Sequence, residues 1–285
     1  SRWIAGRGEP AGTTPMLNGA SGRAQAASVA SSRAMTSARP LVSPSPSPRL
    51  RDTAGRRRSA STSSTRASEP RASAPARLMA VTVLPSPAAG LFTTNLAQAA
   101  PVLVSQAHLA RTGGLARAVV VNSGCANACT GTQGHADAER MAAEVAAALG
   151  CDPSEVLVAS TGVIGVNLPM AKVVPGIRTA ASTLARGQGS AVARALMTTD
   201  PFPKEQAVRV ETAAGTFTVG GTAKGSGMIE PNMATMIGLL ATDAQVAPPL
   251  LRRALEESAR DTFNAITVDG ECSTNDTLFA MASGA

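Results

Sequence analysis

The sequence predicts a mixed α/β fold for the part of the chain that follows residue 79, and two observations support this class. Short apolar runs bounded by Gly, Pro or Asn, which are typical of strands, occur beside longer segments in which apolar residues recur at helical spacing. Both kinds of segment come in runs along the chain. This pattern favours a layered sandwich over a helical bundle.

The first expected elements are strands that lead into turns, with one helix between them. Strands are expected at 81–84, 90–92, 116–121 and 156–158. Pro85 and Pro87 are expected to separate the first two, because proline cannot donate a ladder hydrogen bond. The third is expected to end in a turn over 122–124. Helical spacing of apolar residues predicts a helix over 133–149 that ends at Gly150.

The later elements are two helices, a hairpin and a buried strand. We expect helices at 168–184 and 248–263, hairpin strands at 207–211 and 216–219, and a buried strand at 235–240. Asn167 is the expected cap of the first of these helices, with Pro169 in its first turn. Pro175 is expected to kink or break that helix.

Residues 1–79 differ in composition from the rest of the chain. They contain thirteen Arg, no Lys and three acidic residues, a net charge of +10, whereas the remainder carries −3. With so little apolar surface to bury, this segment is expected to be disordered. Its composition matches an organelle transit peptide, which would place the protein in a chloroplast or mitochondrion instead of the cytoplasm. A mis-assigned gene start or a plain disordered tail gives the same composition, so these alternatives stay open.

Composition argues against several other classes of protein. The basic segment has a single aromatic residue, Trp3, so a nucleic-acid-binding surface with stacking aromatics is not expected. No apolar stretch reaches the ~18 residues that span a bilayer, so a membrane protein is not expected. The four cysteines are too few and too scattered for a disulfide framework or a zinc site, and we expect no metal.

The segment KGSGMIEPNMATM, residues 224–236, has the features of a self-cleavage site. Thr235 is β-branched, follows the small residue Ala234 and precedes an apolar run. Its hydroxyl can attack the preceding carbonyl, move the acyl group from nitrogen to oxygen and leave the ester to water. The new terminal threonine then carries its own base, because an α-amine has a pKa near ~8. The alternative is a Gly-rich turn that leads into a buried strand.

Other polar residues are candidates for binding an oxyanion or a carboxylate. Thr161 and Gly162 follow a predicted strand, and the backbone N–H of a glycine can approach a ligand closely. An ordinary turn explains the same two residues. Lys224 can hold a substrate carboxylate as a compact positive charge, although a solvated surface lysine is the default interpretation. Since His108 and His135 are the only histidines, a Ser-His-Asp triad is not expected.

Residues 224–236 resemble the processing segment of the ornithine acetyltransferase family, the bifunctional glutamate N-acetyltransferases of arginine biosynthesis. Further segments agree in order and spacing: GLFTTN (90–95), NSGCANACTG (122–131), ASTGVIGVNLP (159–169), MTTDPFPK (197–204) and FNAITVDGECSTNDT (263–277). The resemblance implies a layered αββα-type sandwich in which two sheets stack between helices. The fold is expected to be incomplete at the C-terminus, because the family continues well beyond the last segment.

The resemblance implies that the chain cuts itself between Ala234 and Thr235 and that the two products stay together. Thr235 is then the nucleophile that carries an acetyl group from N-acetylornithine to glutamate. No cofactor is expected, and acetyl-CoA is an alternative acetyl donor. The family also implies a heterotetramer of two α and two β chains. The competing interpretations are an N-terminal-nucleophile amidohydrolase or aminopeptidase and an inactive fragment.

The resemblance also assigns roles to single residues. Thr161 and Gly162 match the pair that forms the oxyanion hole of the family. Thr198 and Lys224, together with Thr235, match substrate-binding residues, with Thr199 as the alternative to Thr198. Asn275 and Asp276 are expected only to position their loop near the active site. The expected organisation is a disordered segment at 1–79, the α-chain part at 80–234 and a truncated start of the β chain at 235–285.

Overall fold

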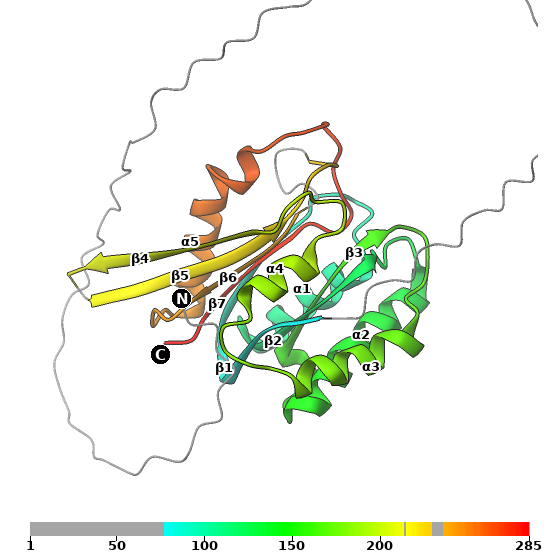
Figure 1. Ribbon diagram of the computed structural model, residues 1–285, viewed down its shortest axis with the longest axis horizontal. Helices are drawn as coiled ribbons and strands as arrows, with labels where there is room; N and C mark the ends of the chain where they lie inside the picture. The colour runs from blue at the N-terminus through cyan, green and yellow to red at the C-terminus, as the bar shows by residue number, and fades with distance from the viewer. Residues whose placement is uncertain (1–76, 214, 230–235, 285) are drawn as a thin grey trace, which may run out of the picture. The chain divides into compact units, whose positions relative to one another are not determined.

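The computed structural model describes residues 77–213, 215–229 and 236–284, and Figure 1 shows their arrangement. Within these ranges seven strands join one mixed sheet in the order β3-β2-β1-β7-β6-β5-β4. The strands are β1 (Arg77–Phe92), β2 (Leu115–Cys125), β3 (Val156–Val163), β4 (Lys204–Thr212), β5 (Gly215–Lys224), β6 (Ile237–Thr242) and β7 (Thr277–Ala282). The α-helices are α1 (Ala100–Thr112), α2 (Gly131–Leu149), α3 (Met170–Ser182), α4 (Gly189–Leu196) and α5 (Pro248–Arg260).

Strand β1 joins two halves of the sheet. Its first part pairs with β2 as far as Pro87, and its second part pairs with β7 from Ala88 onward. The two halves lie face to face, because one buried cluster takes side chains from both of them. That cluster includes Val119, Val121, Leu157 and Ala159 of β2 and β3 and Ile237, Leu239, Phe279 and Met281 of β6 and β7. The sheet is therefore folded over on itself.

Strands β2 and β3 are buried on both faces, and successive side chains alternate between two clusters. Val120 and Val158 pack with α1, α2 and α3, whereas Val119, Val121 and Leu157 pack against the other half of the sheet. This is the period-two alternation of a strand, and burial on both faces explains why these strands read as nearly continuous apolar runs.

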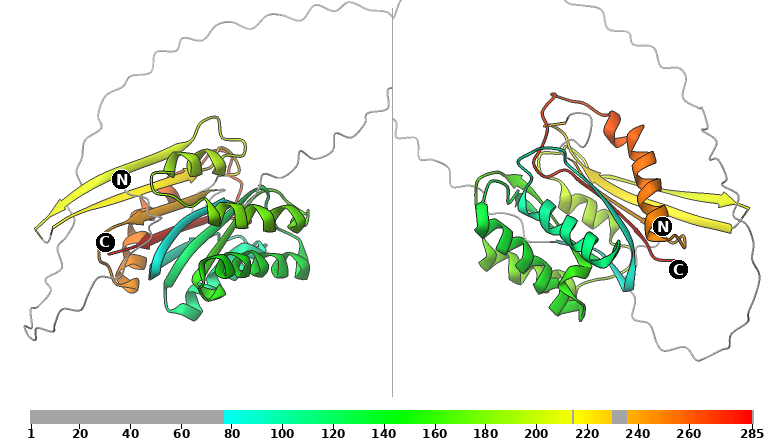
Figure 2. Two further views of the ribbon diagram at one scale, coloured as in Figure 1. Left: turned by 60° about the horizontal axis from the view of Figure 1, so that its bottom comes forward. Right: turned by 180° about the vertical axis from the view of Figure 1, so that it is seen from behind.

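Helices cover the outer face of each half. In Figures 1 and 2, α1, α2 and α3 lie beside β1–β3, and α5 lies along the other half of the sheet. Leu251, Leu255 and Ala259, spaced four apart on α5, pack on Leu278 and Ala280 of β7. The order of layers is thus helix, sheet, sheet, helix, and the predicted αββα sandwich is confirmed.

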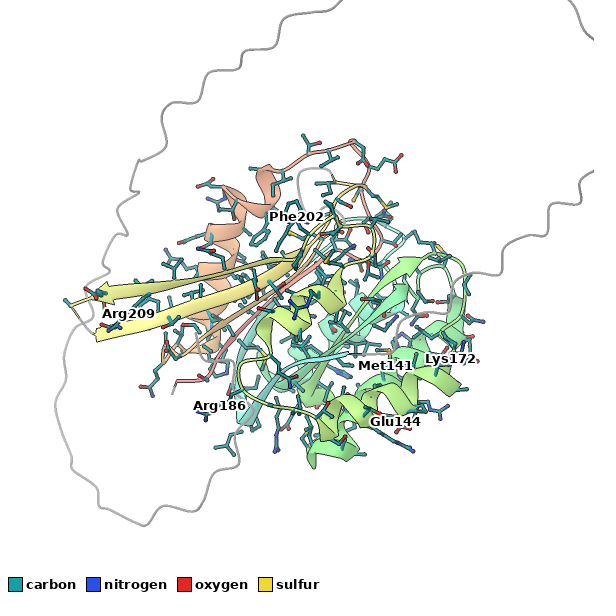
Figure 3. All side chains as sticks on the ribbon, in the orientation of Figure 1. Met141, Glu144, Lys172, Arg186, Phe202 and Arg209 are labelled. Atoms are coloured by element: carbon teal, nitrogen blue, oxygen red, sulfur yellow. The ribbon has the colours of Figure 1, made fainter. Side chains whose placement is uncertain are left out.

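Helices α2 and α3 are held together on the first half. Met141 of α2, labelled in Figure 3, is fully buried against this half. Glu144 on the same helix accepts two hydrogen bonds from Arg178 of α3, at 3.0 and 3.2 Å. Because Arg178 is exposed, this ion pair contributes little to stability, and the apolar contacts hold the layer.

The prediction that Pro85 and Pro87 separate two strands is wrong. β1 is one strand of sixteen residues, and its pairing with β2 shifts register between Val81 and Ser86. Pro85 therefore lies in an irregular stretch of the ladder, and Pro87 forms the last pair with β2, opposite Leu115, before β1 changes partner. At both places a missing N–H costs little. The turn expected at 122–124 is also wrong, because β2 continues to Cys125 in parallel pairing with β3.

The later elements agree better with prediction. β4 and β5 form the expected hairpin. Helix α3 has Pro169, not Asn167, at its N-cap position and continues through Pro175 without a break. β6 begins at Ile237, and residue 235 lies outside the described residues. Of the segment 1–79, only the last three residues are described, and they open β1. No helix of the described part is long and apolar enough to cross a membrane.

Candidate active site

Four strand ends from the two halves of the sheet meet at one place. Lys224 ends β5, Ile237 opens β6 and Thr277 opens β7, and these three residues are in register across the sheet. Thr161, near the end of β3, comes from the other half. It pairs with Ser123 of β2. The folded sheet thus brings the end of β3 beside the residues that directly precede β6 and β7.

Lys224 and Thr161 are joined by a hydrogen bond between the two halves. The ammonium Nζ donates to Thr161 Oγ1 at 3.1 Å, and Lys224 is only 4% exposed. Burial lowers the pKa of Lys224, and the nearby carboxylates of Asp200 and Asp276 oppose that shift. The interpretation of Lys224 as a solvated surface charge is therefore wrong. Thr161 and Gly162 lie on a strand and not in a turn.

Gly162 has a backbone conformation and a setting that suit only glycine. Its φ is +135°, a value that side chains rarely allow. A Cβ at this position would lie 2.2 Å from the carbonyl carbon of Gly124 and 2.5 Å from the nitrogen of Cys125. The glycine is therefore required for β2 and β3 to pair closely at the site.

Asp276 holds the residue that precedes β6. Its Oδ1 accepts the backbone N–H of Met236 at 2.9 Å, and the carbonyl of Met236 accepts the N–H of Thr277 at 3.0 Å. Asp276 is fully buried, and its Oδ2 has no hydrogen-bond partner among the described residues. Burial raises the pKa of Asp276 to about 7, against the lowering effects of the Met236 N–H, the Ser273 side chain and Lys224.

Asp269 holds Met228 and Ile229, which lie on the other side of residues 230–235 from Met236. Its Oδ2 accepts the N–H of Met228 at 2.5 Å, and its Oδ1 accepts those of Ile229 at 2.8 Å and Glu271 at 3.3 Å. The carbonyl of Ile229 in turn accepts the N–H of Val268 at 2.8 Å. The N–H of Met228 is the main cause of the lowered pKa of Asp269. This carboxylate is therefore fixed in its charged form.

Asp200 was not predicted as a site residue and fixes the turn after β5. Its two oxygens accept the N–H of Gly225 at 3.2 and 2.9 Å, and it pairs with Lys204. Burial raises the pKa of Asp200, but the bonds from Lys204 and Gly225 outweigh burial and the net shift is downward. The signal available in the sequence was its place in MTTD, directly after two candidate threonines.

The two candidate threonines of this segment differ in their contacts. Thr198 is exposed, while Thr199 shares a 3.0 Å hydrogen bond with Ser226, beside Gly225. The structure thus connects Thr199 to the turn that follows Lys224.

Asn275 ties the segment before β7 to the ends of β2 and β3. Its side-chain amide donates to the carbonyl of Ala126 at 2.6 Å and to that of Ser160 at 3.0 Å. The Ser160 hydroxyl donates to Asn122 at 2.6 Å. We expected Asn275 and Asp276 only to position their loop near the site. Both side chains are in fact buried within the site. A polar run directly before an apolar strand was the available signal.

The described residues contain neither residue of the predicted cleavage bond. Ala234 and Thr235 lie outside the described residues, so the cleavage and nucleophile assignments stay predictions. Met236, the next residue, is described and is 9% exposed. Within the described ranges no group of three or more His, Cys, Asp or Glu side chains is placed to hold a metal ion.

Sequence comparison identifies the family. The sequence profile of the ArgJ family matches residues 65–285. The chain belongs to the ArgJ family. The match confirms the resemblance carried by the sequence motifs. The "Arginine biosynthesis bifunctional protein ArgJ" of Symbiobacterium thermophilum is 54% identical over 201 residues, which are 70% of this chain and 50% of that protein. The ArgJ of Chlorobium chlorochromatii is 55% identical over 185 residues, 65% of this chain and 43% of that protein.

A solved ArgJ structure also matches part of the chain. The crystal structure of ArgJ from Bacillus halodurans is 43% identical, has a TM-score of 0.49 and covers 54% of this chain and 80% of that chain. The present chain spans about half the length of the curated ArgJ relatives that it matches. These relatives come from bacteria. They therefore give no support to the interpretation of residues 1–79 as an organelle transit peptide.

Proposed function

We propose that the chain is part of a self-cleaving acetyltransferase of arginine biosynthesis. It moves an acetyl group from N-acetylornithine to glutamate through an acetyl-Thr235 intermediate. Membership of the ArgJ family supports the pathway. The observation that carries the chemistry is the buried pair of Lys224 and Thr161 beside the start of β6, because the next residue upstream of Met236 is the candidate nucleophile.

The cut follows from threonine chemistry. The Thr235 hydroxyl adds to the carbonyl of Ala234, the amide nitrogen takes the proton and leaves, and an ester replaces the peptide bond. Water then hydrolyses the ester, which frees the α-amine and the hydroxyl of Thr235. At neutral pH a fraction of this amine is uncharged and can accept the hydroxyl proton in the acetyl-transfer step.

The other predicted residues have separate tasks in the proposed transfer. The hydroxyl of Thr161 and the backbone N–H of Gly162 are the proposed donors to the oxyanion that forms when the acetyl carbonyl is attacked. The ammonium of Lys224 fixes the Thr161 hydroxyl and supplies positive charge for a substrate carboxylate. Thr198, or Thr199 in its place, adds a hydroxyl contact to the substrate.

The remaining features of the proposal concern the assembly and the location. We propose two α and two β chains as the working unit and acetyl-CoA as an alternative acetyl donor, with no bound cofactor. The cytoplasm is the proposed location, since the bacterial origin of the relatives fits this alternative to an organelle.

The test is the intact mass of the expressed chain, measured beside a version that continues to the first stop codon of its transcript. We expect a cut between Ala234 and Thr235 and, in the cut protein, an acetyl group on the new terminal threonine after incubation with N-acetylornithine. Added glutamate should then remove the acetyl group as N-acetylglutamate. The matched control is Thr235→Ala, which should stay uncut and inactive. Acetyl release to water instead of to glutamate would indicate an amidohydrolase, and a cut in Thr235→Ala would overturn the nucleophile.

A further inference from the structure

We propose that Asp269 and Asp276 form a two-point clamp that positions the chain for self-cleavage. Asp269 accepts backbone hydrogen bonds upstream of residues 230–235, the cleavage segment, and Asp276 accepts one downstream of it. Both are positioning residues, since each acts through backbone N–H groups. The inference rests on the proposed function, because it concerns the rate of the proposed cut.

The contacts of the clamp lie on the two described residues nearest to the cleavage segment. Ile229 is the last described residue before it, and Met236 is the first one after it. Ile229 is tied at both its N–H, which donates to Asp269, and its carbonyl, which accepts from Val268. Met236 is tied in the same way, by Asp276 at its N–H and by Thr277 at its carbonyl. The described residues on either side of 230–235 are therefore fixed by backbone hydrogen bonds.

Both grips come from one stretch of chain. Asp269 and Asp276 precede β7, and the chain between them is tied to the scaffold at two points. Asn275 bonds the ends of β2 and β3, and Asn95, which follows β1, donates to the carbonyl of Cys272 at 2.9 Å. The distance between the two grips is thus set by the folded sheet. Fixing both ends lowers the conformational entropy that the segment must lose to bring a hydroxyl onto the preceding carbonyl, which is how positioning accelerates an intramolecular reaction.

The two carboxylates use their oxygens differently, and this difference gives a sharp test. Asp269 accepts through both oxygens, one from Met228 and the other from Ile229 and Glu271. An asparagine there has one acceptor oxygen and would point its NH₂ group at a second N–H. Asp276 accepts the Met236 N–H through Oδ1 alone. An asparagine at this position keeps that bond, and an alanine loses it.

The experiment measures the rate of self-cleavage of freshly made precursor by intact mass, in the form of the chain in which the unaltered sequence cuts. We expect Asp269→Asn and Asp276→Ala to slow the cut by about tenfold or more, since each removes a hydrogen bond that holds the backbone beside the segment. Asp276→Asn should cut within about threefold of the unaltered rate, because it retains the acceptor. Asp261→Asn is the matched control, because Asp261 is the exposed C-cap residue of α5, and it should cut at the unaltered rate.

A second readout separates positioning from a folding defect. Once Asp269→Asn protein is fully cut, it should transfer acetyl groups with a kcat close to the unaltered value, because the clamp affects the cleavage step and not the transfer step. A folding defect would lower both rates by a similar factor and would overturn the proposal. If Asp276→Ala does not fold, the comparison of Asp269→Asn with Asp261→Asn decides alone. Unaltered cutting by both Asp269→Asn and Asp276→Ala would overturn the clamp and leave the proposed function intact, whereas an uncut unaltered chain would count against the proposed function itself.

Discussion

Two aspartates of one short segment behave oppositely because of what surrounds their carboxyl groups. Asp269 is exposed and accepts three backbone N–H groups, which lower its pKa. Asp276 is fully buried with one N–H on it, and burial raises its pKa to about 7. Hydrogen bonds to the charged form outweigh burial in the first case, and burial wins in the second. The residue type alone, which is the same at both positions, could not have indicated this.

The raised pKa of Asp276 predicts how stability changes with pH. A carboxyl whose pKa is higher in the folded protein contributes stability that is fully present below its unfolded pKa of 3.8 and is lost as pH rises through about 7. The loss across this window is on the order of 4 kcal/mol. We expect urea denaturation of uncut Thr235→Ala protein to show this decrease in unfolding free energy as pH rises. The double variant that adds Asp276→Asn should not show it. Persistence of the slope in Asp276→Asn, or its loss in Asp261→Asn, would contradict this assignment.

Gly162 gives a prediction that couples stability to activity. In Gly162→Ala the new Cβ meets the backbone of Gly124 and Cys125, so the ends of β2 and β3 must move apart. We expect a loss of about 1–3 kcal/mol from the backbone conformation alone, and slower formation of acetyl-enzyme because the proposed oxyanion donor moves. Gly165→Ala is the matched control. Its φ of +79° is also positive, but no atom lies within 4 Å of the added Cβ.

Gly165→Ala should therefore lose stability with little effect on acetylation. Thermal unfolding and the acetylation rate, measured by mass, check both variants. Equal acetylation rates in Gly162→Ala and the unaltered protein would remove Gly162 from the oxyanion hole.

At the scale of elements, we expect the proline inside helix α3 to lower the stability of the protein. Pro175 lies inside the helix, where it removes an N–H donor and crowds the preceding turn. We expect Pro175→Ala to raise the unfolding free energy by about 1–3 kcal/mol, measured by urea denaturation. Pro249→Ala is the control, because Pro249 is in the first turn of α5, where proline costs little. An increase of the same size in both variants would show that the helix interior is not the cause.

The elements that the sequence predicted well are those with a local signal. The hairpin of β4 and β5 alternates around a Gly turn, and α2 and α5 carry regular apolar faces. The sequence analysis missed α1, α4 and β7. Helix α1 buries residues at 100–102 and 104–105, on more than one side, so it has no clear polar face. β7 has only six residues, all buried.

The site was predictable in part, and the limit has a physical cause. Lys224, Thr161 and Gly162 stand in recognisable motifs, and the structure brings the first two together. Asp200 and Asp276 act through backbone N–H groups of distant residues. Such contacts depend on how the sheet folds over, and no pattern within one segment can indicate them.

At the scale of the whole molecule, the sheet order interleaves the two products of the proposed cut. β7 and β6, downstream of residue 235, lie between β1 and β5, which are upstream of it. The central core between the two halves also takes side chains from both products. Separation of the products would therefore break two ladders and open this core.

We expect the cut products to co-elute as one complex in size-exclusion chromatography and to separate only in denaturant. The four cysteines are free in the structure, so reducing agent should make no difference. Separate elution of the products in native buffer would contradict the interleaved sheet.

This interleaving also has a consequence for the timing of the cut during synthesis. The ribosome makes β1 and β5 before the two strands that must fill the gap between them. Asp276, which holds Met236, lies 40 residues further along the chain. A nascent chain that has only just exposed Thr235 still lacks both the central strand and the downstream grip. We therefore expect the cut to occur only after β7 has been translated. Nascent chains that end before β7 should all be uncut.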